Sequence, residues 1–406
     1  MGKGNLFVGL EIGTSKICVA VGESRPDGTV KILGVGEEPS RGVRKGEIVD
    51  FETAGKCIRS ALAFAEEKSD VAIGAVYLAV TGAHIQCFNN RGAITIPEER
   101  DEICEEDFDE VQASAREVSI PAPNVFIHSL LQHYYVDGQD GVLNPVGMCG
   151  RRLEADFHII HGIANRVKNS VRCVKEVGPE VIDVVFAPLA TAQVVLDINQ
   201  KGLGALVIDM GGGTTDFIVY VNGAVKMSGC VPIGGDHITN DISLGLRIPI
   251  NRAEKLKREE GSVTIGASVP GDMIVLKDET GFAGKEVERE MLNSIIHCRV
   301  RENLELLRTQ LDEGGVALDY LGAGLMLTGG CSLLDGIREL AEEIFGLQAH
   351  LTHATTVSGN ISAFENPQFS TAIGLIKYAQ AMTPEQPRGL FGWLKDKLAL
   401  AGMWLW

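Results

Sequence analysis

The hydrophobic and polar positions along the chain predict two similar hairpins far apart in the sequence. Apolar and β-branched residues fill 6–12 and 16–22 on either side of a short turn. The later segment GALVIDMGGGTTDFIVYVNGAVKMSG repeats this plan as strand, glycine-threonine turn and strand, followed by an Asn222-Gly223 turn and a third strand. Between the hairpins, 51–68 is predicted to form a helix. The chain is therefore predicted to mix α and β structure.

A third glycine turn is predicted where the strand Leu325–Thr328 leads into a helix. Gly329 and Gly330 form this turn, and apolar residues then recur at helical spacing, at Leu333, Ile337, Leu340 and Ile344. Gly346 is predicted to end the helix. A glycine pair without side chains would let a ribose or a purine pack against the backbone. A plain connection from strand to helix is the alternative.

Each hairpin turn carries residue types that bind phosphate. An acid, Glu11 or Asp209, follows the apolar residues of the first strand, and after it come one residue, glycine and hydroxyl side chains. Glycines let backbone N–H groups approach a phosphate, hydroxyls add donors, and the acid can hold a hydrated Mg²⁺. Neither turn has the spacing of a Rossmann or Walker loop, in which a strand leads into a helix. Two such hairpins facing each other would hold a polyphosphate, although each could also be only a tight turn.

Composition narrows the classes of function. The formal net charge is −17, and a surface that acidic disfavours nucleic acid as a partner. The nine cysteines are scattered without a CxxC pair, which indicates reduced thiols. We expect no signal peptide, because patterned strand sequence begins almost at once, and no uninterrupted apolar run has transmembrane length.

The three turns resemble those of the superfamily that holds actin, the heat-shock ATPases and the sugar kinases. The segments concerned are GLEIGTSK (9–16), VIDMGGGTTD (207–216) and LTGGCSLLDGI (327–337). A closer resemblance, over essentially the whole chain, is to the FtsA family of bacterial cell-division proteins. It depends on the tail and on LLQHYYVDGQDGVLNPVGMCGRRLEADFHIIHG (130–162), IGGDHITNDIS (233–243) and NRAEKLKREEG (251–261).

This resemblance implies an α/β, actin-like two-lobed ATPase fold with an inserted subdomain 1C and a C-terminal amphipathic helix. The implied divisions are 1–84 and 163–202 with part of 357–383 (first lobe, 1A), 85–162 (1C), 203–240 and 316–356 (second lobe, 2A), 241–315 (2B), 384–389 (linker) and 390–406 (membrane helix). The implied function is to bind ATP and Mg²⁺, to polymerise into filaments, and to tether the tubulin-like FtsZ ring to the cytoplasmic membrane. The implied location is the cytoplasmic face of that membrane at the division site.

The resemblance also implies partners and binding residues. The FtsZ C-terminal tail would bind subdomain 2B, later division proteins would bind subdomain 1C, and anionic lipid would bind the terminal helix. Residues matching the family's nucleotide-binding positions are Gly13, Thr14, Ser15 and Lys16 from one lobe and Gly211, Gly212, Gly213, Thr214 and Thr215 from the other, which would face the phosphates. Further matches are Gly234 and Gly235 at a helix N-terminus, Glu254 and Lys257 at the nucleoside, and Gly329 and Gly330 at the adenosine.

Two acids are candidates for catalysis, and two for the metal. Asp209 and Asp216 could orient a water near the γ-phosphate, and Glu11 and Asp209 could hold Mg²⁺ through water. For Glu254 and Lys257 the alternative is a solvated pair one helical turn apart. We expect slow or absent ATP hydrolysis, with ATP mainly closing the lobes and permitting polymerisation.

Three residues depart from the family pattern. Glu11 stands where the superfamily usually has Asp, which puts the metal geometry and hydrolysis in doubt. Cys331 stands where the family often has a third glycine, and its side chain could tighten the adenosine pocket. Lys397 lies within the apolar arc of the predicted terminal helix.

The C-terminal segment is predicted to be an amphipathic helix about 26 Å long. It contains all three tryptophans, and half of the helical wheel holds the membrane-facing residues Leu390, Phe391, Trp393, Leu394, Leu398, Leu400, Trp404 and Leu405. Its charges favour a position in the membrane interface over a bilayer span. The alternatives are a helix docked on its own domain and a helix that binds a protein partner.

Other proteins of the same fold are alternatives for the whole chain. A small-molecule kinase would need a substrate pocket with a catalytic acid between the lobes and would have no use for a lipid-seeking tail. A pilus-assembly adaptor would be another nucleotide-binding scaffold. A heat-shock type chaperone would need a peptide-binding domain, for which the residues after 383 leave no room.

Overall fold

The computed structural model describes residues 5–25, 28–118, 120–266, 269, 271–278, 283–359 and 361–383. The predicted linker at 384–389 and the predicted membrane helix at 390–406 lie outside the described residues. None of the helices in the described ranges combines the length and apolar character needed to cross a membrane.

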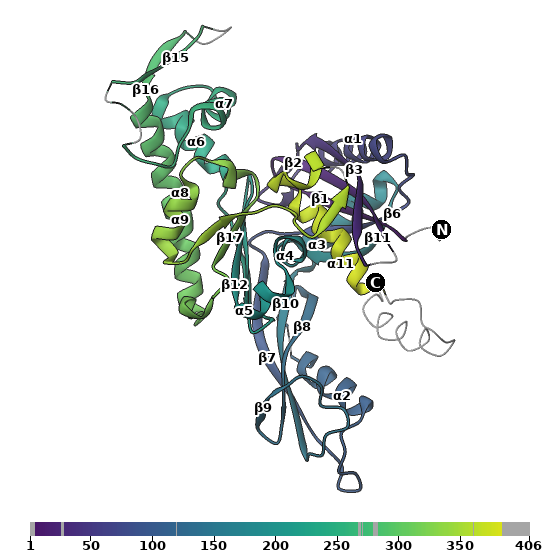
Figure 1. Ribbon diagram of the computed structural model, residues 1–406. Coiled ribbons are helices and arrows are strands. Elements are labelled where there is room, and N and C mark those ends of the chain that lie inside the picture. Colours follow the sequence, from purple (N-terminus) through teal and green to yellow (C-terminus); the bar gives the residue numbers. More distant parts are fainter. Residues whose placement is uncertain are drawn as a thin grey trace.

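Two sheets with related strand orders form the two lobes (Figure 1). The first-lobe sheet has the order β11-β6-β1-β2-β3-β19, and the second-lobe sheet has the order β14-β13-β12-β17-β18. In each sheet three consecutive strands pair antiparallel, and two later strands add in parallel beside the first of them. The lobes therefore have the same core topology, and their predicted phosphate turns stand at equivalent places.

The first lobe is built from N-terminal, central and C-terminal segments. Its strands are β1 (Asn5–Ile12), β2 (Lys16–Ser24), β3 (Val30–Pro39), β6 (Ala75–Val80), β11 (Glu180–Phe186) and β19 (Val357–Gly359), and β4 (Val43–Arg44) and β5 (Glu47–Ile48) form a small ribbon. Its helices are α1 (Phe51–Ser69), α3 (Ala164–Val177), α4 (Ala187–Val195), α10 (Ile361–Phe364), the 3₁₀ turn η3 (Pro367–Phe369) and α11 (Ser370–Met382). The predicted first hairpin and the helix predicted at 51–68 are confirmed. Asp50 begins α1 by accepting a hydrogen bond from the Thr53 N–H, which satisfies a free helical amide.

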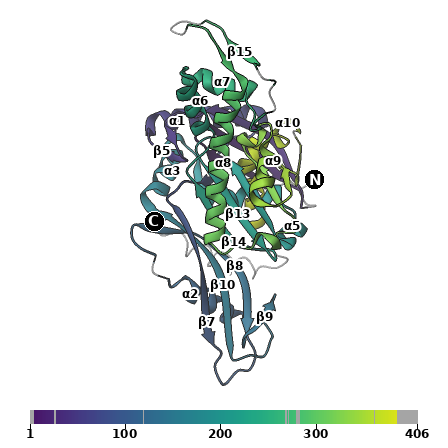
Figure 2. The same ribbon diagram turned by 90° about the vertical axis from the view of Figure 1, so that its left-hand side faces the viewer.

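The second lobe carries a helical extension beside its sheet (Figure 2). Its strands are β12 (Ala205–Met210), β13 (Thr215–Val221), β14 (Ala224–Val231), β17 (Leu325–Thr328) and β18 (Ala349–Leu351). The remaining elements are α5 (Ile198–Leu203), α6 (Gly235–Leu246), α7 (Ile250–Glu260), β15 (Met273–Leu276), β16 (Lys285–Glu288), α8 (Arg289–Glu313), η1 (Leu318–Tyr320), η2 (Gly330–Leu333) and α9 (Ile337–Phe345). The helix α8 buries an apolar stripe that includes Leu292, Ile296, Val300 and Leu304 in the second-lobe core. The expected boundary at 241 falls inside α6.

One predicted element was wrong in extent. The helix after the third turn was predicted to include Leu333, but α9 begins only at Ile337, and Leu333 lies in a 3₁₀ turn with 61% of its surface exposed. Gly336 interrupts the helical pattern because its backbone adopts a positive φ of 79°. Gly346 ends α9 as predicted, with a φ of 68°.

A four-stranded insertion extends from the end of β6, away from the lobes (Figures 1 and 2). It contains α2 (Glu105–Arg116) and the strands β7 (Ile85–Thr95), β8 (Asn124–Val136), β9 (Gln139–Val142) and β10 (Arg152–Ile163). Its base contacts β14 of the second lobe. The Asn89 side chain donates to the Lys226 carbonyl at 3.1 Å, and the His158 Nε2 lies 2.8 Å from the Ser228 hydroxyl. The insertion is also bonded to the first lobe, because His128 Nε2 accepts from the Phe186 N–H of β11 at 3.0 Å.

The helices α4 and α11 fill the space between the two sheets. Residues from both helices and from strands of both sheets share one buried apolar cluster. The helices cross at close range because Gly374 in α11 has no side chain, and a Cβ there would overlap the Ala190 carbonyl of α4. This layer therefore fixes the separation of the two lobes.

We predict that Gly374→Ala lowers the free energy of unfolding by about 1–3 kcal/mol, because the added methyl group forces α4 and α11 apart. Urea denaturation followed by circular dichroism measures the change. The matched control is Gly55→Ala in α1, where a Cβ would meet only ordinary contacts starting at 3.8 Å. That control is expected to be neutral or stabilising by up to about 1 kcal/mol. Equal stabilities for the two variants would contradict the close-packing argument.

Candidate functional site

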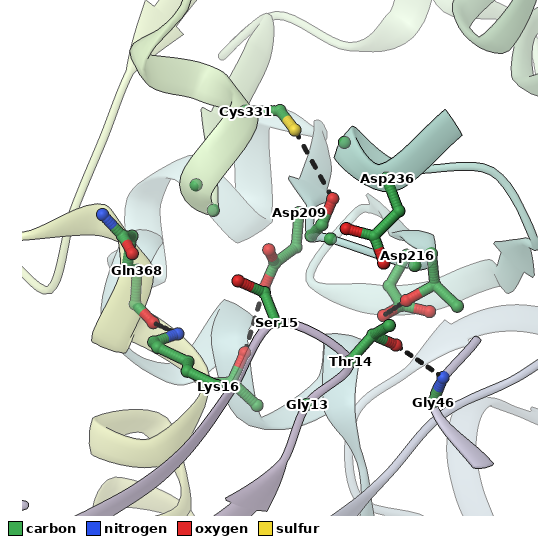
Figure 3. Close-up of a pocket in the computed structure, with 18 of the residues that line it drawn as sticks. Gly13, Thr14, Ser15, Lys16, Gly46, Asp209, Asp216, Asp236, Cys331 and Gln368 are labelled. Carbon is green, nitrogen blue, oxygen red and sulfur yellow. Dashed lines mark hydrogen bonds between the residues drawn. The ribbon is translucent and has the colours of Figure 1, made fainter. Parts of the chain in front are cut away.

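A cleft between the two lobes collects most of the residues predicted to bind nucleotide (Figure 3). The predicted residues that line it are Glu11, Gly13, Thr14, Ser15, Lys16, Asp209, Gly211, Gly212, Gly213, Thr214, Asp216, Gly235, Glu254, Lys257, Gly329 and Gly330. Gly234 and Thr215 are not among the lining residues. The buried Thr215 hydroxyl donates to the Ile233 carbonyl at 2.8 Å and accepts from the Asn303 amide at 2.7 Å, so it serves the second-lobe core.

The two hairpin turns are closed by the same backbone hydrogen bond. The Gly13 N–H donates to the Lys16 carbonyl at 3.0 Å, and the Gly211 N–H donates to the Thr214 carbonyl at 2.9 Å. In each turn the acid precedes the donating glycine by two positions, at Glu11 and at Asp209. The repeated plan in the sequence therefore corresponds to a repeated backbone geometry.

The turns face each other closely, and their side chains are complementary. A Cβ on Gly213 would overlap the Thr14 side chain, and a Cβ on Gly212 would lie 2.8 Å from the Ser15 Cβ. The first turn thus contributes hydroxyl side chains where the second contributes bare backbone. The Thr14 hydroxyl itself accepts a hydrogen bond from the Gly46 N–H at 3.0 Å, which holds it in place (Figure 3).

The charged side chains that line the cleft include the carboxylates of Glu11, Asp209 and Asp216 and the ammonium of Lys16. Burial raises the pKa of Glu11 and of Asp209 above their ordinary values, against the opposing influence of the Lys16 ammonium. Although burial disfavours that ammonium, nearby acids led by Glu11 hold the pKa of Lys16 above its ordinary value. The ammonium donates to the Gln368 carbonyl and lies 5.5 Å from the centre of the Phe369 ring. The site is therefore strongly polar but shielded from water.

The Asp216 carboxylate joins the lobes. The Thr81 hydroxyl, just beyond β6 of the first lobe, donates to Asp216 Oδ1, and the Thr214 hydroxyl lies 3.3 Å from Oδ2. Burial raises the pKa of Asp216 to about 7, although the bond from Thr81 opposes this shift. Its protonation state therefore changes near neutral pH.

The start of α6 differs from the prediction that it meets phosphate. The Gly235 N–H donates to the Gly211 carbonyl at 3.0 Å, and the Asp236 N–H donates to the Gly212 carbonyl at 2.8 Å. The Gly234 N–H is 3.1 Å from His237 Nδ1. These amides already have partners in the protein, so this helix end instead supports the second turn from behind.

Glu254 and Lys257 are not a solvated pair. Lys257 is buried, and its ammonium donates to the Gly235 carbonyl at 3.1 Å, to the Thr239 hydroxyl at 2.8 Å and to the Glu254 carboxylate at 2.6 Å. Cys331, in η2, donates its thiol to the Gly211 carbonyl at 3.4 Å (Figure 3). Burial raises the pKa of this thiol to about 11, so it remains a protonated donor at neutral pH.

The carboxylates fit a cation that is held through water. The buried Glu11 Oε2 has no hydrogen-bond partner among the described residues, and both Lys16 and Asp209 influence the pKa of this carboxyl. An unpartnered buried oxygen is costly, and a water of a hydrated Mg²⁺ would satisfy it. Within the described ranges no group of three His, Cys, Asp or Glu side chains is placed to hold a metal directly. The residues therefore fit Mg²⁺ bound mainly by phosphates and water, for which they would supply outer acceptors.

Several lining residues were not predicted. Thr81, Asp236, Gln368 and Thr371 all reach the cleft. A signal for Thr81 exists in the sequence, because LAVTG (78–82) ends β6 much as LMLTG (325–329) ends β17. Gln368 and Thr371 lie far along the chain from every glycine turn, and no local pattern marks them.

The comparisons with known proteins identify the relatives of this chain. The family model described as cell division protein FtsA matches 206–374, and the model described as the SHS2 domain inserted in FtsA matches 82–161. The cell division protein FtsA of Pseudomonas aeruginosa is 36% identical over 92% of this chain and 89% of its own length. That of Neisseria meningitidis is 34% identical over 97% and 95%, respectively, and that of Escherichia coli is 36% identical over 92% and 90%.

Solved structures of low sequence identity share the fold. A PilM–PilN type IV pilus biogenesis complex gives a TM-score of 0.65 at 16% identity, covering 93% of this chain and 99% of the other. MreB5 of Spiroplasma citri bound to ADP gives a TM-score of 0.54 at 15% identity, covering 93% and 97%. The predicted actin-like two-lobed fold is thereby confirmed. Together with the sequence relatives, this shows that the chain belongs to the FtsA family of actin-like bacterial cell-division proteins.

Proposed function

We propose that this protein binds ATP in the cleft between its lobes and that ATP permits it to polymerise. The observation that carries the proposal is the pair of facing turns, closed by the same hydrogen bond, with hydroxyls on one side and glycines on the other. MreB structures of similar fold are described as bound to ADP and to AMPPNP, which supports a nucleotide as the ligand. Glu254, Lys257, Gly329 and Gly330 would adjoin the nucleoside.

Mg²⁺ is proposed to accompany ATP, with Glu11 and Asp209 accepting hydrogen bonds from its bound water. The cation would neutralise phosphate charge in a cleft that already holds the carboxylates of Glu11, Asp209 and Asp216. Lys16 is the nearby ammonium that can share this task, because its pKa keeps it protonated.

Hydrolysis is proposed to be slow or absent. Asp209 and Asp216 remain the candidates to orient a water, but each already accepts hydrogen bonds from protein hydroxyls. A carboxylate used in this way is less available as a general base. Rapid steady-state release of phosphate by protein that forms no filaments would contradict this part of the proposal.

The family relationship supports the role of an adaptor at the division site. We propose that filaments bind the FtsZ C-terminal tail through 241–315, bind later division proteins through 85–162, and attach to anionic lipid through 390–406. The place of action would be the cytoplasmic face of the cytoplasmic membrane. A small-molecule kinase and a pilus adaptor are less well supported, because the sequence relatives at 34–36% identity are cell-division proteins.

We predict that Gly213→Val weakens ATP binding by about tenfold or more, because the new side chain forces the second turn away from Thr14. Isothermal titration calorimetry of purified protein with ATP measures the dissociation constant. The control is Gly74→Ala, where a Cβ would meet nothing within 4 Å. Wild-type affinity in Gly213→Val would show that the two turns do not hold the ligand between them.

Asp216→Asn is predicted to change the pH dependence of stability. Because the pKa of Asp216 is raised to about 7 on folding, its protonated form stabilises the wild type fully below about pH 4. This contribution is lost as the pH rises through about 7. The variant, which cannot ionise, should lose less stability over this interval and gain about 2–4 kcal/mol relative to wild type at pH 8.

Urea unfolding at several pH values from 4 to 8 measures this difference. Asp216→Asn and the wild type share all other titrating groups, so the difference between their curves reports on Asp216 alone. The shared groups include His128 and His158, whose pKa values burial lowers to about 4. Parallel stability curves for the two proteins would show that the Asp216 carboxyl titrates normally.

Deletion of 388–406 is predicted to abolish binding to anionic vesicles and leave ATP affinity unchanged. A single amphipathic helix binds membranes reversibly, and a filament that presents many of them gains avidity. Co-sedimentation with liposomes, with and without ATP, measures this effect. In the full chain, tryptophan emission reports on the tail alone, because all three tryptophans lie there. Pelleting of the truncated protein with the vesicles would refute the proposed membrane attachment.

A further inference from the structure

The Asp209 carboxylate is held from behind by two threonines of the first lobe. Thr371, in the first turn of α11, lies with its hydroxyl 2.9 Å from Asp209 Oδ2. Thr191, in α4, lies with its hydroxyl 3.2 Å from the same oxygen and 2.9 Å from the Thr371 hydroxyl. Both threonines are buried, at 0% exposure for Thr191 and 3% for Thr371. The carboxylate therefore belongs to the second lobe but is oriented by the first.

The number of hydroxyl protons limits which of these contacts can be hydrogen bonds at the same time. Each threonine hydroxyl has one proton to donate and can accept at its oxygen. A bond to a carboxylate is charge-assisted, so the shorter contact, from Thr371, takes that role. The Thr371 oxygen is then free to accept from Thr191. The result is that Thr371 donates to Asp209. The one Thr191 proton has three acceptors within reach, namely Asp209 Oδ2, the Thr371 hydroxyl and the Ala187 carbonyl at 3.1 Å, so Thr191 supports this bond from the side.

The other carboxylate oxygen is directed to the opposite side. Asp209 Oδ1 lies against Gly329, where a Cβ would overlap it. Only a glycine at this position, with its positive φ of 85°, leaves room for that oxygen at the third turn. Oδ2 is thus occupied by Thr371, while Oδ1 lies against Gly329, which lines the cleft together with Glu11.

The N-terminal end of α11 is itself fixed in place. The Ser370 hydroxyl lies 2.9 Å from the Thr328 hydroxyl of β17. The preceding Gln368 carbonyl accepts from the Lys16 ammonium. Thr371 therefore presents its hydroxyl from a rigid support, which is what precise placement of a metal's outer ligands requires.

We propose that Thr371, supported by Thr191, is a positioning residue that fixes the Asp209 carboxylate so that Oδ1 accepts from the water shell of nucleotide-bound Mg²⁺. The inference rests on the proposed function, since it concerns the same cleft. Neither threonine would touch the nucleotide phosphates in this role. Removing the Thr371 hydroxyl frees the carboxylate to rotate, which weakens its hold on the hydrated cation more than it weakens the binding of ATP alone.

The test compares ATP affinity in Mg²⁺ with ATP affinity in EDTA, by isothermal titration calorimetry on the full chain. Wild type is expected to bind more tightly with Mg²⁺. Thr371→Val keeps the shape of the side chain but lacks the hydroxyl, and is expected to lose about tenfold of the Mg²⁺-dependent gain while keeping its affinity in EDTA. Thr371→Ser should restore the gain. Thr191→Val should show a smaller loss, because the Thr191 hydroxyl makes the longer contact with Asp209 Oδ2 and also lies within reach of the Ala187 carbonyl.

Ser370→Ala is the matched control, because its hydroxyl is adjacent in α11 but is bonded to Thr328 and not to Asp209. It should keep the full Mg²⁺-dependent gain. An unchanged gain in Thr371→Val, or an equal loss with and without Mg²⁺, would overturn the inference. Should Thr371→Val fail to fold, Thr191→Val decides, and a wild-type gain in that variant has the same consequence.

Wild-type results separate this inference from the proposed function. Tight ATP binding that is the same in Mg²⁺ and in EDTA would overturn the role of Thr371 and leave ATP binding intact. The absence of ATP binding under both conditions would instead overturn the proposed function.

Discussion

Buried charge is the constraint on which the rest of the cleft depends. The carboxylates of Glu11, Asp209 and Asp216 and the ammonium of Lys16 are withdrawn from water where the lobes meet. Unpaired charges in such a place cost more than the marginal stability of a domain can bear. The two carboxylates of the second lobe are accordingly bonded by hydroxyls of the first, from Thr81 and Thr371. Opening the lobes would break these bonds, so the charge cluster couples the state of the cleft to the separation of the lobes.

The repeated lobe topology explains why the cluster lies at this place. In both sheets the first strand of the antiparallel set has an acid as its penultimate residue, two positions before the turn glycine. Bringing the two sheets face to face across α4 and α11 therefore brings two acids and two turns together. The close approach then demands asymmetry: Thr14 and Ser15 occupy one turn, and only glycine fits at Gly212 and Gly213. The same backbone plan thus has opposite side-chain requirements in its two copies.

The sequence predicted the local parts of this arrangement well. The strands, the turns and the ends of α1 follow from short-range pattern and capping, and most of the glycines in the turns reach the cleft. What it missed depends on contacts between distant segments. The start of α6 was predicted to meet phosphate, but its amides donate to the carbonyls of Gly211 and Gly212. Likewise, nothing near Thr215 in the sequence shows that its hydroxyl accepts a hydrogen bond from the Asn303 amide of α8. Leu333 was wrongly assigned to the helix α9, because the spacing of apolar residues does not reveal that Gly336 adopts a positive φ.

The helix α11 connects the cleft with the end of the described fold. Its first turn bears Thr371, which is bonded to Asp209, and its last residue, Met382, precedes the segment predicted as the linker. An α-helix transmits displacement along its axis because its backbone hydrogen bonds resist local bending. The helix α11 is also clamped along its length, since Gly374 packs against the Ala190 carbonyl and Tyr378 donates to the Asp183 carboxylate at 3.0 Å. A shift of Asp209 in the cleft must therefore either break its bonds with Thr371 and Thr191 or move α11 together with α4. Movement at the cleft thus cannot be confined to the residues that line it.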